Sequence, residues 1–108
     1  MVIKLKLIYY GKEILGDECK SFWSRFKGFM LQSNIKTFLY FNHCNSIHTF
    51  FMKEHIDVLL CDNDNTILYY YSNLSPNKII LPKKGVSKVY EIPVGYFDIK
   101  INEKVVLK

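Results

Sequence analysis

The stretch IDVLLCDNDNTILYYY, residues 56–71, decides the fold class of this chain. Two runs of branched and aromatic residues, IDVLLC and TILYYY, flank the polar tetrapeptide DNDN. Branched and aromatic residues favour strands, and Asn and Asp accept the backbone angles that tight turns need. The stretch therefore predicts a β-hairpin with its turn at residues 62–65.

Strand patterns continue on both sides of this hairpin. In VIKLKLIYY, residues 2–10, apolar positions alternate with lysines, as in a half-buried strand. The chain is predicted to be a compact, mainly β domain with one short helix (α+β class). Its strands are expected to form a predominantly antiparallel curved sheet or a partly closed barrel, which leaves few sheet edges exposed. Further strands are predicted in KTFLYF (36–41), SIHTFFM (46–52), VSKVYEI (86–92) and the segment after Gly95.

One segment has the period of a helix. In GDECKSFWSRFKGFML, residues 16–31, apolar residues recur every three or four positions and predict an amphipathic helix. Asp17 is the expected N-cap, and Gly28 is expected to end the helix nearby. The apolar stripe that we expect to pack on the sheet consists of Cys19, Phe22, Trp23, Phe26, Phe29 and Met30.

Composition limits the classes of protein. The length suits a single domain, residues 1–108, and the chain shows no repeat or linker. The net charge is +5, but Arg25 is the only arginine, so we expect no specific nucleic-acid binding. Three cysteines and the lack of a signal peptide or membrane span predict a cytoplasmic protein with free thiols.

Histidines and cysteines gather between residues 43 and 61 without a recognised spacing. The segment has no C-x-x-C and no H-E-x-x-H pattern, so we predict no metal site and no cofactor. The calcium-loop pattern that begins at Asp62 lacks its glycine and its final glutamate. Cys44 and His48 would share one face of a strand, which leaves a thiol nucleophile with an imidazole base as an alternative.

Lys53 follows the apolar run of residues 50–52. A lysine in such a run either extends along the surface to water or reaches into a pocket. In a pocket, an acid such as Asp57 or Glu91 could pair with it. Arg25, beside the helical stripe, either holds a carboxylate or a backbone carbonyl or lies on a solvated face of the helix.

Four ordered motifs resemble family 192 of the domains of unknown function. They are RFKGFM (25–30), HTFFMK (48–53), IDV (56–58) and VYEIPVG (89–95), and together they extend over nearly the whole chain. The form CNSIHTFFMK, residues 44–53, is similar to the clostridial version of this family. The resemblance implies a bacterial protein with a compact, mainly antiparallel β domain and a short helix, and it supplies no catalytic role.

The resemblance also marks single positions. His55 stands where many members have proline, and Asn77 and Lys78 replace a Trp-Arg pair. If that pair helps to build a ligand site, the site of this chain is altered. The marked positions are Arg25, Gly28, Met30, Thr49, Met52, Lys53, Asp57, Glu91, Pro93 and Gly95, with Cys44 and His48 from the clostridial form.

Taken together, these patterns predict a non-enzymatic binding module for an acidic small molecule or for a protein or peptide partner. The alternative is an enzyme that uses a perturbed Lys53 or the Cys44–His48 pair. The predicted ligand-binding residues are Lys53, His48, Thr49, Asp57, Arg25 and Cys44.

Overall fold

A computed structural model describes residues 4–108 of the chain. Val2 and Ile3, at the start of the first predicted strand, lie outside the described residues. Within the described part, the chain forms nine strands and one helix. These are β1 (Leu5–Tyr9), β2 (Lys12–Glu18), α1 (Phe22–Lys27), β3 (Phe38–Asn42), β4 (Ile47–His48), β5 (Ile56–Cys61), β6 (Ile67–Leu74), β7 (Ile79–Ile80), β8 (Lys88–Pro93) and β9 (Val106–Leu107).

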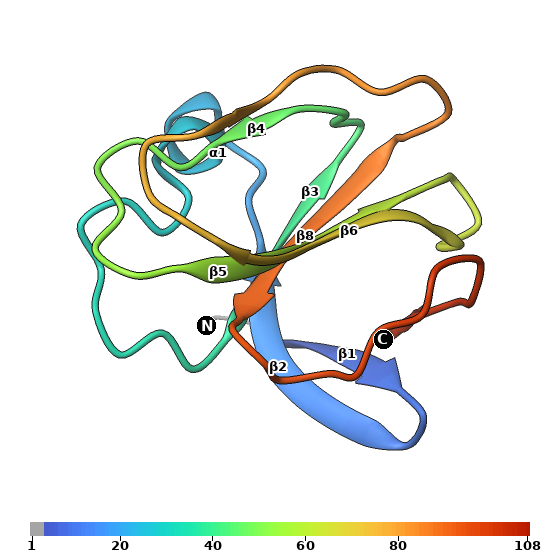
Figure 1. The fold of residues 1–108 in the computed structure, drawn as a ribbon. Coiled ribbons are helices and arrows are strands. Elements are labelled where there is room, and N and C mark those ends of the chain that lie inside the picture. Colours follow the sequence, from blue (N-terminus) through green and yellow to red (C-terminus); the bar gives the residue numbers. More distant parts are fainter. Residues whose placement is uncertain (1–3) are drawn as a thin grey trace.

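Seven strands form one sheet in the order β6-β5-β8-β3-β2-β1-β9, and β4 pairs with β7 in a separate small sheet. All pairings are antiparallel except the one between β2 and β3. These two strands are parallel because the segment between them, which carries α1, returns the chain to the same end of the sheet (Figure 1). The predicted mainly β fold with one short helix is confirmed, with a mixed sheet.

The sheet curls until its two ends are joined by the segment before β9 (Figure 1). The Ile67 N–H, at the start of β6, donates to the Glu103 carbonyl at 2.8 Å. The Val105 N–H donates to the Asn65 carbonyl at 3.1 Å. Since β9 pairs with β1 at the other edge, these bonds make a partly closed barrel, as predicted.

The predicted hairpin is confirmed as β5, a turn and β6. In the turn, the Asp62 Oδ1 accepts the N–H groups of Asp64 and Thr66, at 2.9 and 3.0 Å. Asn65 has a φ of +62°, which its short polar side chain tolerates. Every residue of β5 is buried because neighbouring strands and covering segments enclose it on all sides.

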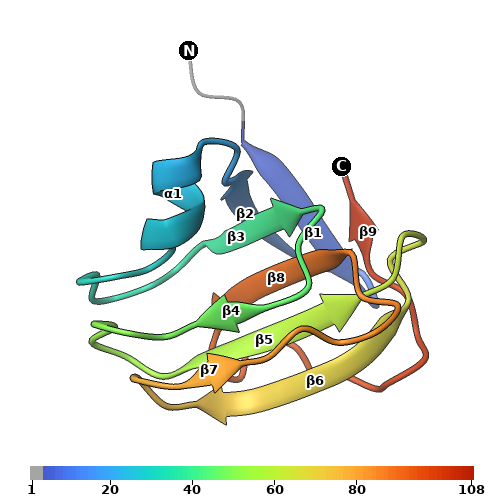
Figure 2. The ribbon, with the colours of Figure 1, turned by 90° about the horizontal axis from the view of Figure 1, so that it is seen from above.

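A hydrophobic cluster covers each face of the sheet. Alternation along β8 directs Tyr90 and Ile92 to the inside of the curl and Val89 and Glu91 to the outside. On the outside, α1 and the β4–β7 pair lie over the sheet (Figure 2). The outer cluster consists of Cys19, Phe29, Phe41, Met52, Ile56, Val58, Leu60, Ile80, Val86 and Val89.

The helix is shorter than predicted, and its N-cap is Ser21, not Asp17. The Ser21 hydroxyl accepts the Ser24 N–H at 3.0 Å, and the Ser24 hydroxyl accepts the Ser21 N–H at 3.1 Å. Asp17 cannot cap the helix because β2 continues through Glu18 to pair with β3. No helix in the described part of the chain is long and apolar enough to cross a membrane.

The apolar stripe does not pack on the sheet as a unit. Trp23 is 65% exposed and Phe26 is 46% exposed, although both lie in α1. Cys19 and Phe29 are buried, but they lie in the segments that flank the helix. The side chain of Phe22 lies outside the described part of the structure. The prediction of one buried helical face is therefore wrong, and two aromatic rings of the helix meet solvent.

Candidate functional site

A cleft of about 400 Å³ opens between α1, the β4–β7 pair and the outer face of the sheet. Apolar and aromatic residues make up most of its wall. A concave, mostly apolar site with a few polar groups is the usual form of a small-molecule site. The polar and charged lining residues are Arg25, Lys27, Cys44, Ser46, His48 and Glu91.

Glu91 lies at the base of this cleft. It projects from β8, is only 3% exposed, and its Oε1 has no hydrogen-bond partner. Burial raises the pKa of this carboxyl to about 8. Glu91 is therefore mostly protonated at pH 7 and offers one O–H donor and a carbonyl acceptor. From the sequence, Glu91 was only a family position and a candidate partner for Lys53.

Gly28 brings the end of α1 close to this carboxyl. Its N–H donates to the Ser24 carbonyl at 3.0 Å, and its φ is +49°, in the region that favours glycine. A Cβ at this position would lie 3.2 Å from the Glu91 Oε1. Gly28 thus ends the helix and leaves room beside Glu91.

His48 forms part of the cleft wall in a defined tautomer. Its Nδ1 accepts the Phe50 N–H at 3.2 Å, so the proton lies on Nε2, which donates to the Phe26 carbonyl at 3.1 Å. The ring lies between Phe26 and Phe50, with both centroid distances at 5.1 Å. Because both nitrogens are engaged, His48 connects α1 to β4 and has no free position to act as a base.

Cys44 also lines the cleft, but it does not pair with His48. Its thiol donates to the Ser46 carbonyl at 3.1 Å. The geometry therefore gives no support to the alternative of a thiol–imidazole enzyme. All three cysteines are free, as predicted, and burial raises the pKa of Cys19 and of Cys61 to about 12.

The described residues contain no group of three or more His, Cys, Asp or Glu side chains that could hold a metal ion.

Arg25 holds backbone carbonyls, one of the alternatives that the sequence left open for it. Its guanidinium donates to the Asn42 carbonyl at 2.7 Å and to the His43 carbonyl at 3.3 Å. These bonds fix α1 to the end of β3. Arginine has five N–H donors, so Arg25, which lines the cleft with Lys27, keeps donors that these two bonds do not use.

Thr49 and Asp57 are buried outside the cleft lining. The Thr49 hydroxyl donates to the Ser75 carbonyl and accepts the Lys78 N–H, both at 2.8 Å. It therefore fastens the loop before β7 to the end of β4. The Asp57 carboxylate is held by three hydrogen bonds inside the fold.

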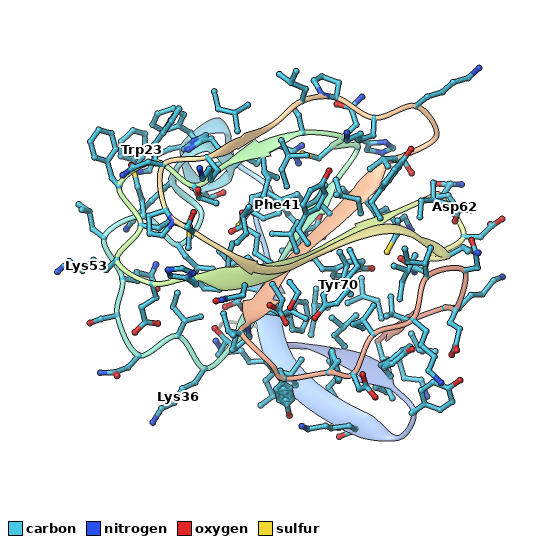
Figure 3. The ribbon with its side chains drawn as sticks, viewed as in Figure 1. Trp23, Lys36, Phe41, Lys53, Asp62 and Tyr70 are labelled. Atoms are coloured by element: carbon cyan, nitrogen blue, oxygen red, sulfur yellow. The ribbon has the colours of Figure 1, made fainter. Side chains whose placement is uncertain are left out.

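Lys53 is exposed and extends away from the fold (Figure 3), and it is not among the residues that line the cleft. Of the six ligand-binding residues predicted from the sequence, the structure brings Arg25, Cys44 and His48 together at the cleft. It leaves the other three outside.

A family model matches residues 12–107, a segment that contains the helix, the cleft residues and Glu91. The chain belongs to family 192 of the domains of unknown function, whose description is "Uncharacterized ACR". The resemblance to family 192 that the sequence indicated is thus confirmed.

Two archaeal proteins are similar to this chain. The chain is 34% identical over 97 residues to a "UPF0127 protein" of Thermococcus sibiricus, covering 84% of this chain and 60% of that protein. It is 35% identical over 94 residues to a "UPF0127 protein" of Thermococcus gammatolerans, and the match covers 82% of this chain and 59% of that protein. The chain therefore spans about 60% of the length of these relatives. The clostridial, bacterial origin stays a prediction from the sequence.

Two solved structures share the fold. One is described as a putative transcription regulator from Sinorhizobium meliloti, with a TM-score of 0.77, 18% identity, and coverage of 95% of this chain and 91% of that chain. The other is a protein of unknown function from Novosphingobium aromaticivorans, with a TM-score of 0.74, 16% identity, and coverage of 97% and 84%. At these identities the likeness shows a shared fold and nothing about function.

Proposed function

We propose that this domain is a non-enzymatic binding module whose cleft holds an acidic ligand with an apolar body and a hydrogen-bonding tip. The observation that carries this proposal is the Glu91 Oε1, which has no hydrogen-bond partner, at the base of an apolar cleft. A buried polar group without a partner costs roughly 1–3 kcal/mol. A hydroxyl or amide at the tip of the ligand would supply the missing hydrogen bond.

The charges that line the cleft favour an acid. With Glu91 protonated, Arg25 and Lys27 are the charged residues of the lining, and both are cationic. An acidic group beside them would stay close to water and keep most of its hydration, while the apolar body enters the cleft. We place this activity in the cytoplasm, where the three free thiols would stay reduced.

The test is an NMR titration with 3-(4-hydroxyphenyl)propanoate, which has a carboxylate, an apolar ring and a hydroxyl tip. We expect saturable shifts at Gly28, Ser46 and Met52, which line the cleft. Lys27→Glu should weaken binding by about tenfold because it reverses a charge in the lining. Lys104→Glu, an exposed lysine that does not line the cleft, is the matched control and should leave binding unchanged.

Lys53→Glu separates this proposal from the site predicted from the sequence. If Lys53→Glu weakens binding and Lys27→Glu does not, the ligand lies against Lys53 and the proposal is wrong. A lack of saturable shifts in the wild type would also overturn it.

A further inference from the structure

An apolar rim of exposed side chains surrounds the cleft. The rings of Trp23 and Phe26 are stacked with centroids 6.0 Å apart, and His48 continues the row from Phe26 to Phe50. Large exposed apolar patches mark surfaces that bind other molecules. We define the rim as Trp23, Phe26, Phe50, Phe51, Ile79 and Leu81, all of them exposed.

Phe51 has an unfavourable backbone conformation at this rim. Phe51 and Leu31 have φ values of +60° and +62°, and the Leu31 N–H donates to the Phe51 carbonyl at 2.9 Å. They are 66% and 65% exposed. A left-handed conformation costs such residues about 1–2 kcal/mol, and the fold gains little burial in return. Strain of this kind collects at functional sites.

We propose that the apolar rim and the cleft together dock a segment of another protein that presents a tyrosine flanked by acidic residues. This inference rests on the proposed function, because the tyrosine would be the ligand's apolar body and hydrogen-bonding tip. Its ring would fill the cleft and its hydroxyl would pair with Glu91. Tyrosine is also one of the residues that most often dominate the energetics of protein interfaces.

The charge of the rim matches acidic flanks. Lys27, Lys53 and Lys78 are exposed on the same segments that carry the rim residues. On the segment that carries Phe51 and Lys53, the carboxylate of Glu54 accepts the N–H groups of residues 34 and 35, at 2.7 and 3.2 Å, and keeps its negative charge. The three lysines outnumber this one acid. The surface around the cleft is therefore basic, and complementary charge selects an acidic partner. In this arrangement Lys53 contacts the flank of the partner from outside the cleft.

Two other occupants fit less well. A second copy of this chain would bring the same lysines to the contact, since a two-fold dimer pairs identical patches. A lipid bilayer would cover the rim, but acyl chains have no group that can hydrogen-bond to Glu91. A tyrosine-containing acidic segment satisfies the rim, the lysines and the buried carboxyl together.

The test uses phage-displayed random twelve-residue peptides, selected on the wild-type protein. We expect the selected peptides to carry a tyrosine with Asp or Glu within a few positions. A synthetic copy should be displaced by 3-(4-hydroxyphenyl)propanoate and should lose about tenfold in affinity when its tyrosine becomes phenylalanine.

Phe51→Asn tests the rim apart from the cleft. Asn tolerates a positive φ, so the loop should keep its shape. We expect about tenfold weaker peptide binding and unchanged binding of the small acid. Tyr10→Asn is the matched control, because Tyr10 is also an exposed aromatic with a positive φ, at 76% exposure and +50°, but lies outside the rim.

Several results would overturn the proposal. The phage selection would contradict it by yielding no peptides, or peptides that lack tyrosine and acidic residues. Binding to anionic phospholipid vesicles that Phe51→Asn abolishes would point to a membrane instead. A dimer in sedimentation that Phe51→Asn dissociates would point to a second copy of the chain. If the small acid binds and no peptide does, the partner is wrong and the proposed function stands. If the small acid also fails to bind, both fall.

Discussion

Two buried acids, Asp57 and Glu91, differ in their hydrogen-bond partners. Asp57 accepts hydrogen bonds from the Tyr70 hydroxyl at 2.9 Å, the Asn73 N–H at 2.8 Å and the Gly95 N–H at 3.0 Å. Glu91 has an Oε1 with no partner. The first acid joins β5, β6 and the turn after β8. The second shows no such bond at its Oε1, and the proposed binding role of Glu91 is based on this contrast.

Replacing Asp57 should destabilise the protein strongly. Asp57→Ala leaves three donors without their acceptor, and we expect a loss of about 3 kcal/mol in the free energy of unfolding. Urea denaturation measures this change. Asp64→Ala, in the exposed hairpin turn, is the control and should change the free energy by less than about 0.5 kcal/mol. Equal losses in the two variants would contradict the structural role of Asp57.

Replacing Glu91 should have the opposite effect on stability. Glu91→Leu removes a buried polar group without a partner and keeps the cleft base filled. We expect the free energy of unfolding at pH 5, where the folded Glu91 is protonated, to rise by about 1–3 kcal/mol, while the small acid loses its hydrogen-bonding site. Chemical denaturation checks the first expectation and NMR titration the second. A clear loss of stability would mean that Glu91 has a partner in the folded protein.

At the scale of elements, the parallel contact of β2 with β3 depends on the lack of a side chain at Gly16. A Cβ there would lie 2.1 Å from the Phe38 carbonyl oxygen, a backbone atom that cannot move alone. We expect Gly16→Ala to destabilise the protein by about 3 kcal/mol or more, seen as a lower midpoint in thermal denaturation. Leu15→Ala, at a half-exposed neighbour, is the control, with a loss near 1 kcal/mol. A wild-type midpoint for Gly16→Ala would contradict the close strand contact.

The helix shows how far a sequence period predicts an element. The spacing of Trp23 and Phe26 indicates helical conformation correctly, but it does not say what covers the apolar face. The sequence offers the sheet as the obvious cover, whereas these rings remain exposed at the rim. Likewise, β4 and β7 have two residues each, and their pairing joins residues more than thirty positions apart. No local pattern predicts so short a pairing.

For the whole molecule, alternation and turn residues predicted the class of fold, because they follow from strand geometry. The cleft was only partly predictable. Arg25 stood out as the only arginine, and Cys44 and His48 as a thiol and an imidazole on one strand face; all three line the cleft. Asp57 and Glu91 both lie in buried strands, so the sequence could not tell the acid with three partners from the acid whose Oε1 has none. Partners are set by the tertiary structure.

Stability of the whole molecule should depend on pH through Glu91. The folded carboxyl keeps its proton up to its raised pKa of about 8, whereas the unfolded chain releases it near the ordinary glutamate pKa of 4.5. The folded state therefore binds more protons between these values, and stability falls as pH rises from about 4.5 to 8. The expected loss is of the order of 3–5 kcal/mol. Urea denaturation at pH 5 and pH 8 should show this loss in the free energy of unfolding of the wild type. The loss should be much smaller in Glu91→Gln, which has no carboxyl to titrate.

The most direct test of the binding site compares two acids on two proteins. They are 3-(4-hydroxyphenyl)propanoate and 3-phenylpropanoate, each titrated into the wild type and Glu91→Leu by NMR. If the hydroxyl tip meets Glu91, the wild type should prefer the hydroxyl acid by about tenfold, and Glu91→Leu should lose that preference. The same preference in both proteins, or none in the wild type, would contradict a ligand whose tip pairs with Glu91.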